Sequence, residues 1–170
     1  MQYFEDIRLN DPRALGSWNF TAEAIKRFAA QFDPQPFHLD EEAGRNSLFG
    51  GLAASGWHVG SASVALLVAD WQRQEKEMRA RGEQPGAWGP SPGFRDMRWT
   101  RPVLAGDTLS FVFEVVGKRR SASRPGWGLM EAVITGTNQR GEKTFTVTTT
   151  AFVPVRGEES GPEAPGPEVG

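Results

Sequence analysis

The sequence contains no cysteine among its 170 residues. The fold therefore cannot rest on disulfide bonds, and both a thiolate nucleophile and a zinc–thiolate site are excluded. Histidine is scarce as well, with two residues in the whole chain. Because histidine is the side chain that ordinarily titrates near neutral pH, any acid/base chemistry depends on very few groups.

A strong charge of either sign and a long hydrophobic run are also missing. The formal net charge is −2, which gives no general attraction to nucleic acid or to an anionic membrane. No apolar run approaches the ~20 residues that a membrane span requires, and the first residues lack the pattern of a secretory signal. We therefore expect no nucleic-acid or membrane partner and take the cytoplasm as the simplest location.

Apolar residues are frequent enough to form a core. They make up 38% of the chain, with eleven Phe and six Trp, and the length suits a single domain. Residues 157–170 are a mixture of Gly, Pro and Glu that cannot bury much apolar surface. The sequence thus predicts one domain over residues 1–156, followed by a disordered tail over residues 157–170.

The order of the expected elements is that of an α+β protein with an antiparallel sheet. Apolar residues at helical spacing predict a helix that Thr21 caps and that ends before Pro34. Residues 56–71 are small or apolar on nearly every side, which is typical of a helix wrapped by other elements. The remaining expectations are an extended segment at 18–20, a short acidic helix at 40–45, an exposed loop that follows a charged helical continuation within 72–93, and strands at 94–99, 108–118, 126–137 and 143–155.

Asp33 and His38 stand five residues apart in a segment that also holds Pro34 and Pro36. The two prolines predict a stiff loop, with both side chains outside regular structure. A histidine and a carboxylate held together in this way can share proton transfers. Their spacing alone fits a structural role better, in which Asp33 caps a turn and His38 packs in the core.

A metal site is not favoured at the same place. His38 has Asp33, Asp40 and Glu41 nearby in sequence but lacks the second histidine of a nitrogen-ligand site, and His58 has no partner at ligand spacing. The Gly-rich run 49–56 comes directly before the apolar helix.

Unpaired backbone N–H groups at the start of that helix suit an oxyanion, and Gly56 is the natural donor. Glycines are equally common where a helix passes close to a sheet. The run matches no phosphate-binding pattern, which speaks against a nucleotide cofactor.

Two stretches, FDPQPFHLDEEAGRNSLFGGLAASGWH and RWTRPVLAGDTLSF, resemble the MaoC-like dehydratases, the family that includes the (R)-specific enoyl-CoA hydratases. The resemblance implies a hot-dog fold, in which a curled antiparallel sheet wraps a long central helix and two units pair edge to edge as a homodimer, with a higher homo-oligomer also open. It implies that Asp33 and His38 activate water and that the amide of Gly56 polarises a thioester carbonyl. An acyl-CoA is then the substrate, and no metal or redox cofactor is required.

The expected activity is that of a hydro-lyase, the reversible addition of water to a 2-enoyl-CoA. Two alternatives stay open, namely a thioesterase on the same fold and a protein that binds acyl-CoA without turnover. Gln35 and Ser55 depart from the hydratases, which usually have Asn-Pro in this loop and histidine before the glycine.

Overall fold

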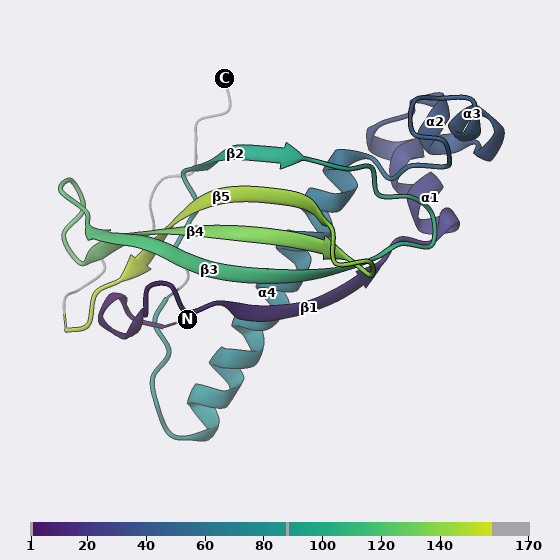
Figure 1. The fold of residues 1–170 in the computed structure, drawn as a ribbon. Helices are drawn as coiled ribbons and strands as arrows, with labels where there is room; N and C mark the ends of the chain where they lie inside the picture. The colour runs from purple at the N-terminus through teal and green to yellow at the C-terminus, as the bar shows by residue number, and fades with distance from the viewer. Residues whose placement is uncertain (1, 88, 158–170) are drawn as a thin grey trace.

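Five antiparallel strands form one sheet, and a long helix, α4, crosses one of its faces in the computed structural model, which describes residues 2–87 and 89–157 (Figure 1). The strand order is β1-β3-β4-β5-β2, so β1 and β2 are the two edges. This is the hot-dog arrangement, and the expected α+β fold is confirmed. The elements are η1 (Phe4–Asp6), β1 (Arg13–Asn19), α1 (Ala22–Phe32), α2 (Pro36–Leu39), α3 (Glu41–Arg45), α4 (Gly56–Ala80), β2 (Gly93–Trp99), β3 (Thr108–Arg120), β4 (Trp127–Asn138) and β5 (Lys143–Pro154).

Alternation along the strands builds the core. Leu109, Phe111 and Phe113 of β3 are buried at every second position, and β4 alternates over its whole length. Successive side chains of a strand point to opposite faces, so one face of the sheet becomes apolar and receives the helix. The strand boundaries expected from the sequence are confirmed to within two residues, apart from the first strand, which begins at Arg13 rather than near Trp18.

Helix α4 is less enclosed than the sequence pattern indicates. It runs for 25 residues, about 37 Å, and extends past the edge strand β1 (Figure 1). Val59 and Leu67 are buried against the sheet, whereas Trp57 and Val64 are 55% and 54% exposed. The expectation that other elements wrap this helix on nearly every side is therefore wrong for the single chain, because its own sheet covers one face only.

The three short helices gather at the end of the sheet where α4 begins (Figure 1). Thr21 caps α1 as expected, since its side chain accepts a hydrogen bond from the Ala24 N–H. Ile25 and Ala29 of α1 are buried, while Phe32 at its end is 67% exposed and does not share the buried face.

The stiff loop expected for residues 33–38 is only partly correct. Asp33 does lie outside regular structure, directly after α1, but His38 lies on the short helix α2. The reason is Pro36, which takes the first helical position, where its fixed φ suits a helix and its missing N–H costs nothing. The second proline thus starts a helix instead of prolonging the loop.

Two other expectations concern the ends of elements. The loop after α4 begins at Arg81, because the charged residues 72–80 continue the helix, as expected. The tail predicted over residues 157–170 lies outside the described residues from residue 158 onward. Within 2–87 and 89–157, no helix combines the length and the apolar character needed to cross a membrane.

Asp70 anchors the middle of α4 to the edge strand β1. Its side chain is fully buried and lies 2.8 Å from Nε of Arg13, as an ion pair without the alignment of a hydrogen bond. Arg73 and Gln74 donate to its two oxygens. A buried carboxylate with these partners ties helix to sheet through charge.

We expect Asp70→Ala to lower the free energy of unfolding by about 2 to 4 kcal/mol, because it leaves the charge of Arg13 without its buried partner. The matched control is Glu23→Ala on α1, where an exposed pair with Arg27 is lost and the expected cost is below about 1 kcal/mol. Urea unfolding measures both. Equal losses in the two variants would contradict this role of Asp70.

Candidate functional site

The segment 53–56, just before and at the start of α4, is the frame of the site. The Ala53 N–H donates to the Phe37 carbonyl over 3.2 Å, and the Ala54 N–H donates to the Val103 carbonyl over 2.7 Å. All of Ala53, Ala54 and Ser55 are buried. The segment is thus held between α2 on one side and the turn before β3 on the other.

Asp33 and His38 meet beside this frame. His38 Nε2 lies 3.4 Å from Asp33 Oδ2, and the imidazole is 4% exposed. The ring packs edge-on to Phe37, with 4.6 Å between ring centroids, and stacks near Phe49 at 6.1 Å. The structure therefore brings together the two residues that the sequence singled out, and aromatic rings hold the imidazole in place.

The hydrogen bond on the far side of the ring defines the proton on His38. Nδ1 lies 2.7 Å from the carbonyl oxygen of Ala53. A carbonyl oxygen can only accept, so Nδ1 carries the hydrogen. In the neutral ring, Nε2 then presents a lone pair toward Asp33. A water molecule that donates to both acceptors fits such an arrangement.

Asp33 accepts two hydrogen bonds, one on each carboxylate oxygen. Ser55 Oγ donates to Oδ2 over 2.7 Å, and Gln35 Nε2 donates to Oδ1 over 2.8 Å. Burial raises the pKa of Asp33, but the bonds from Ser55 and Gln35 and the nearby His38 lower it further than burial raises it. The net pKa lies below its ordinary value, so the carboxylate is ionised at neutral pH.

Gly56 opens α4, and the ring of Trp99 lies against it. A Cβ at this position would come within 2.6 Å of the Trp99 ring, so the close approach requires glycine. Trp99 Nε1 donates to the Gly56 carbonyl over 2.9 Å, which fixes the indole. The N–H of Gly56 is at the first helical position and has no acceptor within the helix.

These groups share one hollow of about 510 Å³. It is lined by Asp33, Gln35, Phe37, His38, Phe49, Ala53, Ala54, Gly56, Trp57, Val59, Trp99, Thr100, Arg101, Pro102 and Val103. An acid/base pair, an available amide and apolar walls are thus within reach of one small molecule. No group of three or more metal-ligating side chains occurs in the part of the chain that the structure describes.

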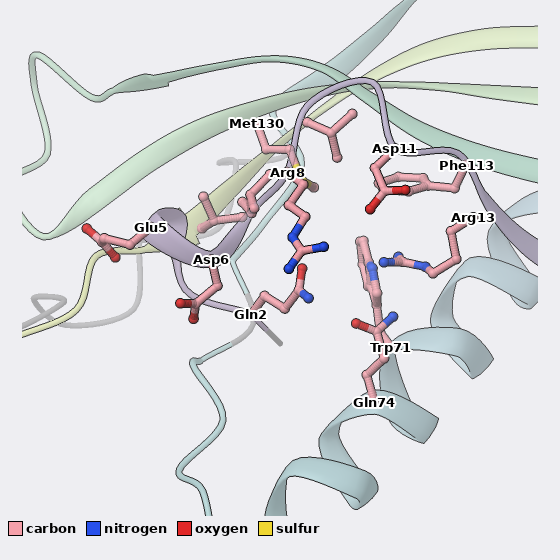
Figure 2. A pocket seen from close by; sticks show the side chains of 13 residues that line it. Gln2, Glu5, Asp6, Arg8, Asp11, Arg13, Trp71, Gln74, Phe113 and Met130 are labelled. Carbon is pink, nitrogen blue, oxygen red and sulfur yellow. The ribbon is translucent and has the colours of Figure 1, made fainter.

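A larger cavity, of about 670 Å³, lies elsewhere (Figure 2). Trp71 of α4 lines it, fifteen residues or about 22 Å along the helix from Gly56. Two of its charged residues are already paired, Arg13 with Asp70 and Asp6 with Arg156. No histidine is among the described residues that line it. The smaller hollow is therefore the candidate site.

Sequence reasoning missed two contributors to this hollow. Trp99 reaches Gly56 across 43 positions of sequence, and the Ala53 carbonyl acts through the backbone, so neither leaves a local pattern. Ser55 was noted only as a departure from the hydratases, although its hydroxyl contacts Asp33.

His58, the second histidine, belongs to the core rather than to the hollow. It stacks on Phe28 with 4.7 Å between ring centroids and meets Phe20 edge-on at 5.0 Å. Its Nδ1 has no hydrogen-bond partner among the described residues. Burial lowers the pKa of His58, and the positive charge of Arg27 lowers it further.

The fold and the hollow together define a hot-dog protein with an Asp/His pair at the head of its central helix. Residues 9–126 match the family model described as MaoC like domain. The chain therefore belongs to the MaoC-like dehydratase family. This membership supports a hydratase or dehydratase activity in general terms.

Individual relatives agree with the family match. A MaoC-like dehydratase structure from Rhodospirillum rubrum is 37% identical, covers 92% of this chain and 99% of that one, and has a TM-score of 0.76. The (R)-hydratase PhaJ1 from Pseudomonas aeruginosa is 22% identical over 99% of this chain and 96% of its own, with a TM-score of 0.65, and is similar in fold. The uncharacterized protein YdeM from Bacillus subtilis is 27% identical over 133 residues, 76% of this chain and 82% of that protein.

The buried His58 makes a pH-dependent contribution to stability. Its pKa is lowered in the folded state, so the unfolded chain takes up a proton first as the pH falls below about 6.5. We expect the free energy of unfolding to fall from there toward pH 5, by at most about 1.4 kcal/mol per pH unit for this one group.

His58→Phe keeps the stacked ring and removes the titration, so urea unfolding between pH 7.5 and 5 should show a shallower decline than in the unsubstituted protein. Glu23→Gln, an exposed substitution on α1, is the control for a general charge effect. Identical slopes in His58→Phe and the unsubstituted chain would contradict the assignment.

Proposed function

We propose that this protein catalyses the reversible addition of water to a 2-enoyl thioester, with coenzyme A as the carrier of the acyl group. The observation that carries the proposal is the 3.4 Å approach of His38 Nε2 to Asp33 Oδ2 in the same hollow as the N–H of Gly56. Hydration needs one group that handles protons and one that polarises the thioester carbonyl. The family match supports the reaction class.

Water is the group that the Asp/His pair would hold. Ionised Asp33 accepts hydrogen bonds only, and neutral His38 accepts at Nε2 because Nδ1 donates to Ala53. One water donates a hydrogen to each of them and turns a lone pair of its oxygen toward the substrate. The β-carbon of the enoyl group is the electrophile that this oxygen attacks.

The protons balance within the pair. As the water oxygen bonds to the β-carbon, one of its protons passes to the pair, and the pair delivers one proton to the α-carbon. The two groups lie 3.4 Å apart and face the same water, so the proposal assigns the acid and base roles to Asp33 and His38 jointly. The reverse sequence removes water from a 3-hydroxyacyl thioester.

Gly56 is the proposed donor to the thioester oxygen. During attack at the β-carbon, electrons move through the α-carbon onto that oxygen, which gains negative charge. An N–H at the start of a helix is oriented by the backbone and benefits from the helix dipole. A preorganised donor of this kind is worth roughly 2.7 to 4 kcal/mol in the transition state.

The test uses crotonyl-CoA and longer 2-enoyl-CoAs, following the enoyl absorbance and the release of free thiol together. Hydration predicts absorbance loss without thiol. We expect Asp33→Asn and His38→Ala each to lower kcat/KM by about 100- to 10,000-fold, the range for a general acid/base group. His38→Ala removes one of the two groups that hold the water, and Asp33→Asn removes the negative charge and replaces one accepting oxygen with a donating NH2 group.

Glu23→Gln serves as the matched carboxylate control, because this residue is exposed and is not among those that line the hollow. Its rate should equal that of the unsubstituted chain. Thiol release in step with absorbance loss would assign a thioesterase instead. No turnover of any enoyl-CoA, with binding retained, would point to a protein that only binds acyl-CoA.

We also propose that the active species is a homodimer that forms through the edge strand β2 and the exposed face of α4. An apolar hollow of about 500 Å³ lies there, with Trp57 and Val64 on the helix and Phe94 and Met97 on the strand. Trp57, Val64 and Phe94 are each more than half exposed in the single chain. An unpaired strand edge beside such a patch favours association.

Phe94→Glu and Val64→Glu should therefore convert a dimer into a monomer, because each places a charge in the apolar patch. Val112→Glu, an exposed apolar position on β3 outside the patch, is the control and should leave the dimer intact. Light scattering after size-exclusion chromatography measures the mass. A monomer for the unsubstituted chain would overturn this part of the proposal.

A further inference from the structure

Ser55 occupies a position between the two halves of the proposed machinery. It is the N-cap of α4, it is 1% exposed, and it directly precedes Gly56. Its side chain faces the Asp33 carboxylate rather than solvent. A hydroxyl at this place therefore contacts the acid/base pair, while the next backbone N–H in the chain is the proposed oxyanion donor.

The Ser55 hydroxyl both donates and accepts a hydrogen bond. Oγ–H donates to Asp33 Oδ2 over 2.7 Å, because an ionised carboxylate can only accept. The same oxygen accepts the Trp57 N–H over 3.2 Å, because a backbone N–H can only donate. Hydroxyl hydrogens usually rotate among partners, but here the two bonds leave one orientation.

The oxygen that Ser55 holds is the one that faces the histidine. Asp33 Oδ2 receives the Ser55 bond and lies 3.4 Å from His38 Nε2. Asp33 itself follows the last residue of α1 and has no regular secondary structure to orient it. With Gln35 on the other oxygen, the Ser55 bond fixes the rotation of the carboxylate about its own axis.

The bond also affects the charge of the carboxylate. Burial raises the pKa of Asp33, and a hydrogen bond that is donated to the ionised form lowers it. Ser55 is the stronger of the two hydrogen-bonding influences that lower it. A side chain that cannot donate at this position would leave the half-buried carboxylate easier to protonate.

We propose that Ser55 is a positioning residue that orients Asp33 toward His38 and holds it in register with the Gly56 N–H through one shared hydroxyl. This inference rests on the proposed hydration. It gives a role to Ser55, which stands at the position where the hydratases have histidine. Ser55 acts through Asp33 and touches no reacting atom.

The kinetic test compares Ser55→Ala, Ser55→Thr and Ser63→Ala on enoyl-CoA. We expect Ser55→Ala to lower kcat on the order of 10- to 100-fold, as for other residues that orient a reactive group, with KM changed less than about threefold. The acid limb of its pH–rate profile should move to higher pH. Ser55→Thr keeps the hydroxyl and should recover most of the rate.

Ser63→Ala is the matched control, because Ser63 is equally buried in α4 but its hydroxyl donates to the Gly60 carbonyl instead of a carboxylate. It should keep the rate and the pH profile of the unsubstituted chain. An unmoved acid limb in Ser55→Ala, or a loss of kcat as large in Ser63→Ala, would overturn the role of Ser55.

A second measurement separates this inference from the reaction itself. Carbon-13 NMR of the Asp33 carboxyl gives its pKa in the folded chain without turnover, and we expect a higher value in Ser55→Ala than in the unsubstituted protein or in Ser63→Ala. If no hydration is found but the pKa of Asp33 rises in Ser55→Ala, the proposed reaction is wrong and the Ser55–Asp33 contact stands. An unchanged pKa would overturn the contact, whatever the activity.

Discussion

The position of the segment 53–56 is the constraint on which the candidate site depends. Its backbone is bonded to α2 through Ala53 and to the turn before β3 through Ala54. The Trp99 indole then bonds to the carbonyl of Gly56, the first residue of α4. Because the same few residues receive contacts from a short helix, a strand end and a loop, the acid/base pair and the helix start cannot shift independently.

At Asp33, hydrogen bonds from the protein replace part of the contact with water. Partial burial disfavours the ionised carboxylate, and the donors Ser55 and Gln35 offset that cost. The donors occupy one position on each oxygen, and the remaining lone pairs stay available for water. His38 differs from Asp33 in that it donates a hydrogen bond: Nδ1 donates to the Ala53 carbonyl, and Nε2 faces Asp33. Each partner is thus anchored on one side and open on the other.

Much of the fold could be predicted because it follows from local patterns. The alternating residues of β3 to β5 and the capping Thr21 act within a few positions of one another, and their elements lie where expected. The enclosure of α4 could not be predicted, since a small, apolar helix looks the same whether its own sheet or a second chain covers it. Helix α2 was not predicted, because Pro36 fits either the end of a loop or the first turn of a helix.

In the candidate site, too, the residues that form a local motif could be predicted and the long-range contacts could not. Asp33, His38 and Gly56 lie within 24 residues and could be found as a motif, whereas Trp99 and Val103 come from the end of β2 and the loop after it, far along the sequence. The Ser55–Asp33 bond spans 22 positions and needs the turn between α3 and α4 to bring its ends together. The motif therefore singles out the groups that we propose to react, and the tertiary contacts determine how those groups are held.

The two halves of α4 differ in the groups that they offer to a ligand. Near Gly56 the helix supplies an N–H that has no acceptor within the helix, and Gly56 itself places no side chain in the hollow. Near Asp70 the side chains of Arg13 and Arg73 pair with its buried carboxylate, and the larger cavity beside them has no histidine among the described residues that line it. A cavity's volume alone does not indicate function, and in this chain the smaller hollow is the one that brings a histidine and a carboxylate together beside a helix start.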